Sequence, residues 1–324
     1  MEDSTNGRGA LRALLAGAVD YAGLFAPARL AMGPAVRRYA ADRRSAARWM
    51  LGRFVVPVAR LEEFEAAALD LLPAGEEDEP WRLSALAGAA PGSDLAHDLA
   101  RDLARAAAFN ARHAPETGAG RAVVDAVEWR GPDGPAFGEM LGAAAAARAR
   151  HLPGAPLYAE LPPGADADAF ARAAAGVRLR LKLRTGGVTA DAFPAPDVVL
   201  AVLDAAVRHG IAAKLTAGLH HPLRGEHALT YDAGSARGTM YGFVNVLLAA
   251  ALLRAGHAPA AVAPLLDERD PAAFAFTSDG AAWRGLAADA STVAAARGAT
   301  LVGFGSCAFD EPVGELRALG WWPE

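Results

Sequence analysis

The chain has 324 residues, 53% of them hydrophobic, with a formal net charge of −5 and an isoelectric point near 5.9. This length supports one large domain with a substantial core. The acidic balance argues against nucleic acid or an anionic membrane surface as a partner. The single cysteine, Cys307, excludes an internal disulfide. Because residues 1–10 also lack the pattern of a secretory signal, we expect a cytoplasmic protein.

Short β-like segments alternate with helical segments along the chain. In chain order the predicted strands are residues 19–25, 53–58, 82–88, 122–129, 157–162, 179–185, 212–218 and 301–307. Helices are predicted between them, for example over 94–114 and 195–210. Strands that alternate with helices indicate a parallel sheet. Eight such units in one domain predict an α/β fold, a (β/α)₈ or TIM barrel that spans residues 1–324.

The segment 219–298, between the last two predicted strands, is too long for one crossover. It holds an apolar run at 241–253, too short to span a bilayer and typical of a buried helix, and a β-like run at 273–279. We expect this segment to be an insertion before the last strand that covers one end of the barrel. Counting 274–277 as a strand in place of 19–25 would also give eight.

The alternation of residues within each strand predicts which side chains face the barrel axis. The outer face of a barrel strand is covered by helices and must be apolar, so the polar residues between the leucines of 179–185 point inward. That places Lys182 and Arg184 inside, and the same rule places Lys214 and Thr216 inside the next strand. Three further residues are turned inward by this rule: Asp125, Tyr158 and Glu160.

Lysine is rare in this chain. Lys182 and Lys214 are the only lysines among 32 basic residues. A lysine can lose its proton and attack a carbonyl, whereas an arginine stays charged. A nearby cation, Lys214 or Arg184, would lower the pKa of Lys182. Moving that pKa from ~10.4 to ~7 takes about 4–5 kcal/mol, the order that one cation at ~4 Å supplies. The alternative is a pair of structural ion pairs with Asp125 and Glu160.

Five stretches of the chain resemble, in the same order, the strands of deoxyribose-phosphate aldolase and its class I aldolase relatives. They are VDYAGLFAP, VVDAVEW, LKLRTGG, AKLTAGL and GATLVGFGSC. These relatives are (β/α)₈ barrels that form a Schiff base on a lysine. The chain departs from their pattern after the first lysine, where it has Leu183-Arg184 and the relatives have a serine-threonine pair. It departs again at Leu219-His220, where they have a second glycine.

The resemblance implies a role for each matching residue. Lys182 would be the nucleophile, Lys214 the cation that lowers its pKa, and Asp125 the acid/base residue. Asp20 would support the site. The phosphate end of the substrate would be lined by Gly218, Gly305 and Ser306.

Polar residues after the seventh predicted strand extend the candidate site. His220 and His221 fall at the mouth of the barrel, as a general base or as substrate-binding residues, and Arg224 is a candidate clamp for a carboxylate or phosphate. Glu160, Arg184 and Thr216 complete the predicted substrate-binding set.

These features predict a lyase of the class I aldolase type. It would act on a small carbonyl compound such as a sugar, phosphorylated or not, without a cofactor or metal, and without nucleic-acid or membrane partners. Whether the chain forms a homo-oligomer is left open. One alternative is a metal-assisted hydrolase or lyase centred on His220. Its further ligands would be Glu128, Glu160, Asp279 or Cys307. The other is a non-catalytic barrel that binds an anion through Arg184 and Arg224.

Overall fold

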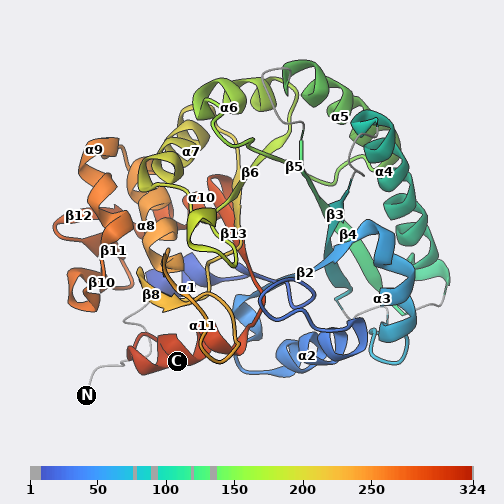
Figure 1. Ribbon diagram of the computed structural model, residues 1–324, viewed down its shortest axis with the longest axis horizontal. Helices are drawn as coiled ribbons and strands as arrows, with labels where there is room; N and C mark the ends of the chain where they lie inside the picture. Colours follow the sequence, from blue (N-terminus) through green and yellow to red (C-terminus); the bar gives the residue numbers. More distant parts are fainter. Residues whose placement is uncertain (1–8, 76–78, 89–93, 118–119, 132–136, 323–324) are drawn as a thin grey trace.

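A closed barrel of eight parallel strands forms the centre of the computed structural model (Figure 1). The strands are β1 (Val19–Tyr21), β2 (Leu51–Pro57), β3 (Trp81–Ala87), β4 (Ala122–Trp129), β5 (Leu157–Glu160), β6 (Arg180–Arg184), β7 (Ala213–Thr216) and β13 (Leu301–Ser306). Each strand overlaps one of the eight predicted regions, and no strand end lies more than two residues outside its region. The predicted α/β barrel is therefore confirmed. The segment at 274–276 forms a strand outside the barrel, and 19–21 is the first barrel strand.

The structure describes residues 9–75, 79–88, 94–117, 120–131 and 137–322. Residues 1–8, on which part of the expectation of a missing export signal rests, lie outside this range. No helix within the described ranges is both long and apolar enough to cross a membrane.

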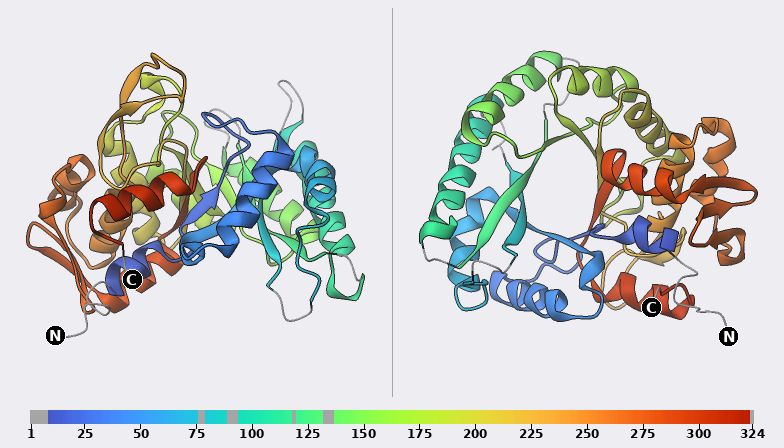
Figure 2. Two further views of the ribbon diagram at one scale, coloured as in Figure 1. Left: turned by 90° about the horizontal axis from the view of Figure 1, so that it is seen from below. Right: turned by 180° about the vertical axis from the view of Figure 1, so that it is seen from behind.

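A ring of helices covers the outer face of the barrel (Figures 1 and 2). Its members are α2 (Met32–Arg44), α3 (Leu61–Ala68), α4 (Leu95–Arg112), α5 (Phe137–His151), α6 (Ala167–Gly176), α7 (Pro196–Arg208), α8 (Phe243–Arg254) and α10 (Ala290–Ala299). The short helix α1 (Gly9–Leu15) packs beside α10, and α11 (Asp310–Ala318) follows the last barrel strand. Outward leucines such as Leu181 and Leu215 are buried beneath this ring, as the apolar alternation predicts.

The long segment between β7 and β13 does two different things. Its first part is an antiparallel hairpin, β8 (Gly225–Ala228) and β9 (Arg237–Met240), which follows β7 at the carboxyl end of the barrel (Figure 2). The rest joins the outer wall: α8 packs between α7 and α10, and every residue from Phe243 to Leu253 is buried. Such an all-round apolar helix is a core element.

A small sheet and a short helix complete this segment on the outside of the ring. The sheet is antiparallel and consists of β10 (Phe274–Phe276), β11 (Gly280–Trp283) and β12 (Leu286–Asp289), beside α1 and α10. The helix α9 (Pro259–Val262) lies next to α8. Only the early part of 219–298 therefore lies at the mouth of the barrel. Most of the segment that we expected to cover the barrel end belongs instead to its outer wall.

A β-bulge in β4 decides which acidic side chain reaches the axis. Leu83 of β3 pairs with Val124, but Ser84 pairs with Ala126, so β4 has one extra residue, Asp125. An extra residue reverses the alternation beyond it. Glu128 therefore points inward, although unbroken alternation from Asp125 would turn it toward the helices.

Gly52 in β2 makes room for the carboxylate of Asp20. A Cβ atom at position 52 would lie 2.2 Å from Asp20 Oδ1 and 3.1 Å from the carbonyl oxygen of Gly17. The backbone N–H of the next residue, Arg53, donates to the same Oδ1 at 2.6 Å. The carboxylate of Asp20 is thus fixed by a close approach that only glycine permits.

We expect Gly52→Ala to lower the free energy of unfolding by about 1–3 kcal/mol, because the added methyl group displaces a buried carboxylate. Gly142→Ala in α5 is the matched control. A Cβ there meets nothing within 4 Å, so the change should be neutral or stabilising by about 0.5–1 kcal/mol. Urea denaturation of both variants measures the difference, and equal effects would contradict the crowding at position 52.

Candidate functional site

Both lysines of the chain point into the barrel from neighbouring strands. Lys182 of β6 and Lys214 of β7 are partners in register and are 5% and 2% exposed. Their ammonium groups bind the two oxygens of one carboxylate. Lys182 Nζ lies 3.0 Å from Glu128 Oε2, and Lys214 Nζ contacts Glu128 Oε1. The carboxylate of Glu128 therefore bridges the two ammonium nitrogens.

Two more carboxylates complete this group. Glu160 of β5 lies 3.1 Å from Lys182 Nζ, and Asp20 of β1 lies 2.6 Å from Lys214 Nζ. We call Asp20, Glu128, Glu160, Lys182 and Lys214 the lysine cluster. The hydroxyl of Ser84 on β3 donates to Glu128 Oε1 at 2.8 Å. The cluster thus brings two amino groups and three carboxyl groups together, contributed by five strands of the barrel.

The cluster fixes the charge of its central members. Burial lowers the pKa of Lys214, but the negative charges of Asp20 and Glu128 outweigh burial and hold this pKa above its usual range. Burial raises the pKa of Glu128, but Lys214 and Lys182 outweigh burial and hold it well below its usual range. Lys214 therefore stays protonated and Glu128 ionised at neutral pH. From the sequence we expected the positive charge of Lys214 to lower the pKa of Lys182. In the structure, the carboxylates of Asp20 and Glu128 balance that charge.

Asp125, the predicted acid/base residue, lies away from both lysines. It forms ion pairs with Arg53 at 2.6 Å and Arg82 at 2.7 Å. It precedes Glu128 by three residues on β4, so it belongs to a layer nearer the amino ends of the strands. The position that we assigned to Asp125 beside the lysines is occupied by Glu128, because of the bulge in β4.

Part of the lysine cluster forms the floor of a pocket with a volume of about 280 Å³, which we call the lysine pocket; Asp20 and Glu160 are not among its lining residues. Lys182, Lys214 and Glu128 line it together with apolar residues of β2, β3 and the segment after β1. Other predicted site residues on its wall are Arg184, Thr216, His220 and Gly305. The pocket therefore combines a buried ionic floor with a mostly apolar wall, the usual composition of a small-molecule site.

Gly218, which the resemblance assigned to the phosphate end, packs against Gly186 of the loop after β6. A Cβ at Gly186 would lie 2.9 Å from the Cα of Gly218, and both would collide with the ring of Phe193. Gly218 also has φ +72, a conformation that glycine adopts without strain. Glycine at both positions allows the loops after β6 and β7 to touch. Neither residue belongs to the lining of the lysine pocket.

His220 connects the pocket to the last strand and to α11. Its Nδ1 lies 3.3 Å from the hydroxyl of Ser306, 3.8 Å from Cys307 Sγ and 3.5 Å from Glu311 Oε2. Burial lowers the pKa of His220, but the contacts with Cys307 and Glu311 outweigh burial and raise it to about 9. Ser306 also donates to the carbonyl oxygen of Ala308 at 2.7 Å, so its hydroxyl is already engaged.

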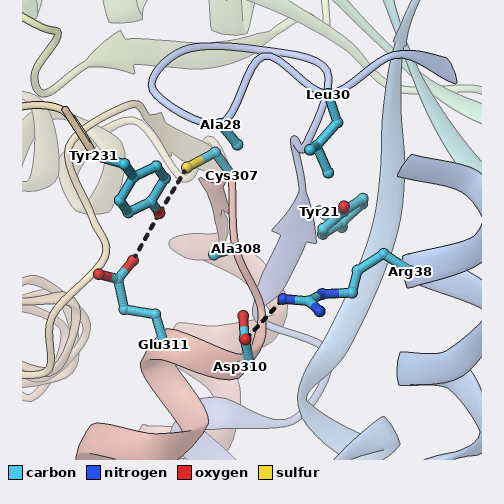
Figure 3. Close-up of a pocket in the computed structure, with 9 residues that line it drawn as sticks. All are labelled: Tyr21, Ala28, Leu30, Arg38, Tyr231, Cys307, Ala308, Asp310 and Glu311. Carbon is cyan, nitrogen blue, oxygen red and sulfur yellow. Dashed lines mark hydrogen bonds and ion pairs between the residues drawn. The ribbon is translucent and has the colours of Figure 1, made fainter. Parts of the chain in front are cut away.

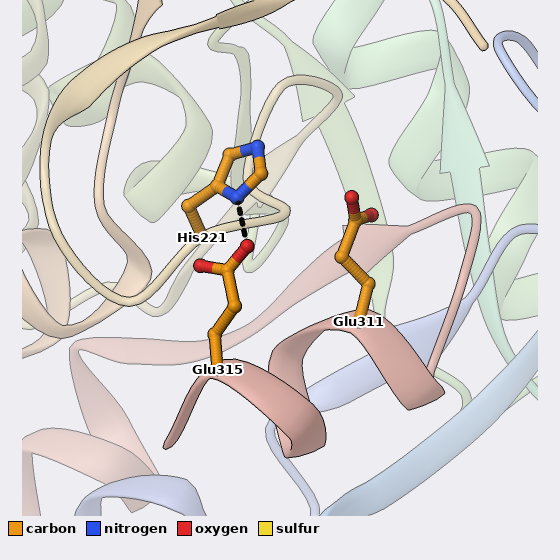
Figure 4. A group of neighbouring side chains, drawn as sticks. All are labelled: His221, Glu311 and Glu315. Atoms are coloured by element: carbon orange, nitrogen blue, oxygen red, sulfur yellow. Dashed lines mark hydrogen bonds and ion pairs between the residues drawn. The ribbon is translucent and has the colours of Figure 1, made fainter. Parts of the chain in front are cut away.

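His221 lies on a different wall, where it meets two carboxylates of α11 (Figure 4). Its Nδ1 is 2.6 Å from Glu315 Oε1, and Glu311 is the third member of the group. One possible ligand atom from each residue lies within 4.8 Å of the other two. The ring of His221 also stacks on His227 of β8, with centroids 3.4 Å apart. Among the described residues, this is the group whose spacing suits a metal ion.

Arg224 and Asp279 are not brought to the pocket. Arg224 forms an ion pair with Asp267 at 2.8 Å and lies 4.3 Å above the ring of Tyr241. It therefore does not share a ligand site with Arg184, as the anion-binding alternative requires. Asp279 lies between β10 and β11 on the outside of the helix ring.

Glu311 and Glu315 were not identified as site residues from the sequence. The spacing of four residues on one helix is a usable signal, since it places both side chains on one face. Nothing in the sequence shows, however, that this face meets His221, which precedes Glu315 by 94 positions.

No protein-family model matches the chain, and a search of curated proteins finds no match. Among solved structures, a mutant organophosphorus hydrolase aligns at 12% identity with a TM-score of 0.35, covering 68% of this chain and 70% of that one. A second mutant, of an organophosphorus hydrolase from Deinococcus radiodurans, has 14% identity and a TM-score of 0.33, with the same coverage. A nitroalkane oxidase from Streptomyces ansochromogenes has 14% identity and a TM-score of 0.30, covering 66% of this chain and 62% of that one. Likeness at this level carries no inference about chemistry.

We expect Lys214→Met to lower the free energy of unfolding by about 3–5 kcal/mol at pH 7, because it leaves Asp20 and Glu128 buried without their cation. Arg60→Met is the control, since Arg60 forms only an exposed ion pair with Glu63, and loss of such a pair should change the free energy of unfolding little. Denaturant titrations compare the two variants.

The same variant has a defined pH dependence. The pKa of Lys214 is raised on folding, so its stabilisation is complete below the unfolded-state pKa of ~10.4 and is lost as the pH rises toward the folded-state pKa. The deficit of Lys214→Met should therefore stay constant from pH 7 to 9 and shrink at more alkaline pH. A deficit that vanishes by pH 8 would contradict this charge assignment.

Proposed function

We propose that this protein is an enzyme that forms a Schiff base between Lys182 and a small carbonyl substrate, and makes or breaks a carbon–carbon bond as class I aldolases do. The observation that carries the proposal is the convergence of the only two lysines on one buried carboxylate at the floor of a pocket. A purely structural ion pair would be served as well by arginine, which this chain uses nearly everywhere else.

The contacts of the two lysines support different roles for them. Lys214 is held by Asp20 and Glu128, and its raised pKa keeps it a cation. Lys182 is held by Glu128 and Glu160, and the side chain of Glu160 is 18% exposed, against 3% for Glu128. Lys182 thus has a partly open carboxylate beside it that can accept its proton. We assign Lys182 as the nucleophile and Lys214 as a fixed positive charge.

The reaction begins with proton transfer from Lys182 to Glu160. The neutral amine adds to the substrate carbonyl, and the resulting carbinolamine loses water after its hydroxyl is protonated, which leaves an iminium ion. The bond between the α- and β-carbons then breaks, and its electron pair flows toward the iminium to form an enamine. The hydroxyl on the β-carbon loses its proton, and that fragment leaves as an aldehyde. Protonation of the enamine and hydrolysis then release the second fragment. In the reverse direction the enamine attacks an aldehyde.

Glu160 is the group best placed to take the proton of Lys182. It contacts the nitrogen of Lys182, and it is not bound to the second lysine. Glu128 is less suited, because two ammonium groups and Ser84 hold it and lower its pKa. The acid/base role that the resemblance gave to Asp125 therefore passes, in this proposal, to Glu160.

Borohydride reduction in the presence of glyceraldehyde, dihydroxyacetone or pyruvate should attach one adduct to the peptide that contains Lys182. With two lysines in the chain, peptide mass mapping identifies the site directly. Trapping should fall at least tenfold in Glu160→Gln, since the variant cannot accept the proton of Lys182.

Lys182→Arg is the control for the trapping experiment. Arginine preserves the positive charge opposite Glu128 and Glu160 but cannot form a Schiff base. We expect no adduct and a nearly unchanged thermal midpoint. An adduct that persists in Lys182→Arg, or one that maps only to Lys214, would exclude the assigned nucleophile.

A second candidate function is that of a metal-assisted hydrolase or lyase, with its centre at the mouth of the barrel. It is supported by the group His221, Glu311 and Glu315, which offers one imidazole nitrogen and two carboxylate oxygens within 4.8 Å of one another. These donors suit Zn²⁺ or Mn²⁺ and leave positions open for water and substrate. A bound ion would activate a water molecule or polarise a carbonyl. The predicted centre, His220, is the neighbour of this group but is not part of it.

If this second function is correct, titration with Zn²⁺ in a calorimeter should give one site that is lost in Glu315→Gln and in His221→Ala. His97→Ala, an exposed histidine of α4, is the control and should bind as the wild type does. Binding that survives the loss of His221 would place the ion elsewhere.

A further inference from the structure

A second cavity lies beside the lysine pocket (Figure 3). Its volume is about 420 Å³, and its walls come from β1, the segment after β1, α2, the β8–β9 hairpin and the start of α11. We call it the outer cavity. None of the five members of the lysine cluster lines it, so the Schiff-base chemistry gives it no role. Of the candidate metal group, Glu311 alone belongs to its lining.

The two cavities share a wall. Cys307, at the end of β13, lines both of them. The segment after β1 also serves both, since Phe25 and Ala26 line the lysine pocket while Ala28 and Leu30 line the outer cavity. A molecule in the outer cavity would therefore lie next to the compartment that contains Lys182.

The polar groups of the outer cavity are hydrogen-bond donors and acceptors of mixed type. Arg38 of α2 donates to Asp310 at 2.8 Å, and the hydroxyl of Tyr231 donates to Glu311 at 3.2 Å (Figure 3). The Arg38–Asp310 pair is half exposed, so both groups keep bonding capacity for a ligand. The rings of Tyr21 and Tyr231 supply flat apolar surface. Planar charged groups beside aromatic rings suit a molecule that carries several hydroxyl groups.

The start of α11 argues against a phosphate group in this cavity. A helix N-terminus attracts anions, and a phosphate is often bound there. In α11 the first two helical residues are Asp310 and Glu311, and both line the cavity. Their carboxylates occupy the favourable positions and would repel a phosphate. Arg38 is already opposite Asp310, so it does not reverse this balance.

We propose that the outer cavity binds the uncharged polyhydroxyl chain of a sugar-like substrate, and that this substrate is not phosphorylated. The proposal rests on and deepens the Schiff-base function, because the cavity assigned to the hydroxylated chain borders, at Cys307, the pocket that contains Lys182. Binding of the hydroxylated chain rests on the outer cavity alone. It does not require the lysine to react.

The test uses xylitol and ribitol, which carry the hydroxyl groups but have no carbonyl and cannot form a Schiff base. We expect both to bind the full-length protein in saturation-transfer NMR and to weaken about tenfold or more in Arg38→Gln and in Asp310→Asn, which each remove one charged hydrogen-bonding group. Arg60→Gln is the matched control, since it removes an exposed arginine of a similar ion pair outside the cavity. It should bind as the wild type does.

A parallel measurement separates this proposal from the Schiff-base function. Lys182→Arg should bind xylitol as tightly as the wild type. If it does, and borohydride traps no adduct in the wild type, the outer cavity stands and the proposed function fails. Ribose should bind more tightly than ribose 5-phosphate, and Glu311→Gln should narrow that difference.

Three results would overturn the proposal. The first is the absence of detectable xylitol and ribitol binding to the wild type at millimolar concentration. The second is binding that Arg38→Gln and Asp310→Asn leave unchanged, which would place the polyol elsewhere. The third is tighter binding of ribose 5-phosphate than of ribose, which would assign the cavity to an anion.

Discussion

The carboxylate of Glu128, shared between two buried ammonium groups, is the interaction on which the candidate site depends. A single ionised side chain at 2% exposure would be strongly destabilising. Here each oxygen of Glu128 has its own lysine, and Ser84 donates a further hydrogen bond. Asp20 and Glu160 then balance the two cations. The network is stable only as a unit, because removal of one charge leaves its partners buried and unpaired.

Local backbone features place this network, and they lie on strands that are distant in sequence. The bulge at Asp125 turns Glu128 toward the axis, and Gly52 leaves space for Asp20. Around the floor so formed, the segments after β1, β7 and β13 build two cavities with Cys307 between them. This arrangement follows the general division of such barrels, in which the strands supply rigid positions and the loops at their carboxyl ends supply selectivity. In the proposed function, the ionic floor would hold the carbonyl end of the substrate and the outer cavity its hydroxylated chain.

The strands of the barrel and the inward direction of Lys182, Lys214 and Glu160 were predictable from the sequence. The reason is that these signals are local. A strand between a sheet interior and a helix layer must place apolar residues on every second position, and the leucines of 179–183 do so without interruption. Two lysines in a chain that otherwise uses arginine marked where an ammonium group is needed. The buried helix α8 was equally visible, because the run 241–253 is apolar apart from one asparagine.

The tertiary structure alone decided which acid meets the lysines and how the long segment after β7 is used. Alternation selects Asp125, but a bulge depends on pairing with the neighbouring strand, so its effect on Glu128 is absent from the local pattern. The same holds for His221 and Glu315, which meet because α11 packs against the loop that follows β7. The sequence by itself determined the barrel and the inward direction of its two lysines, since periodicity and composition are properties of the chain. Contacts between distant segments determined their partners, because a side chain's neighbours are set by register and packing.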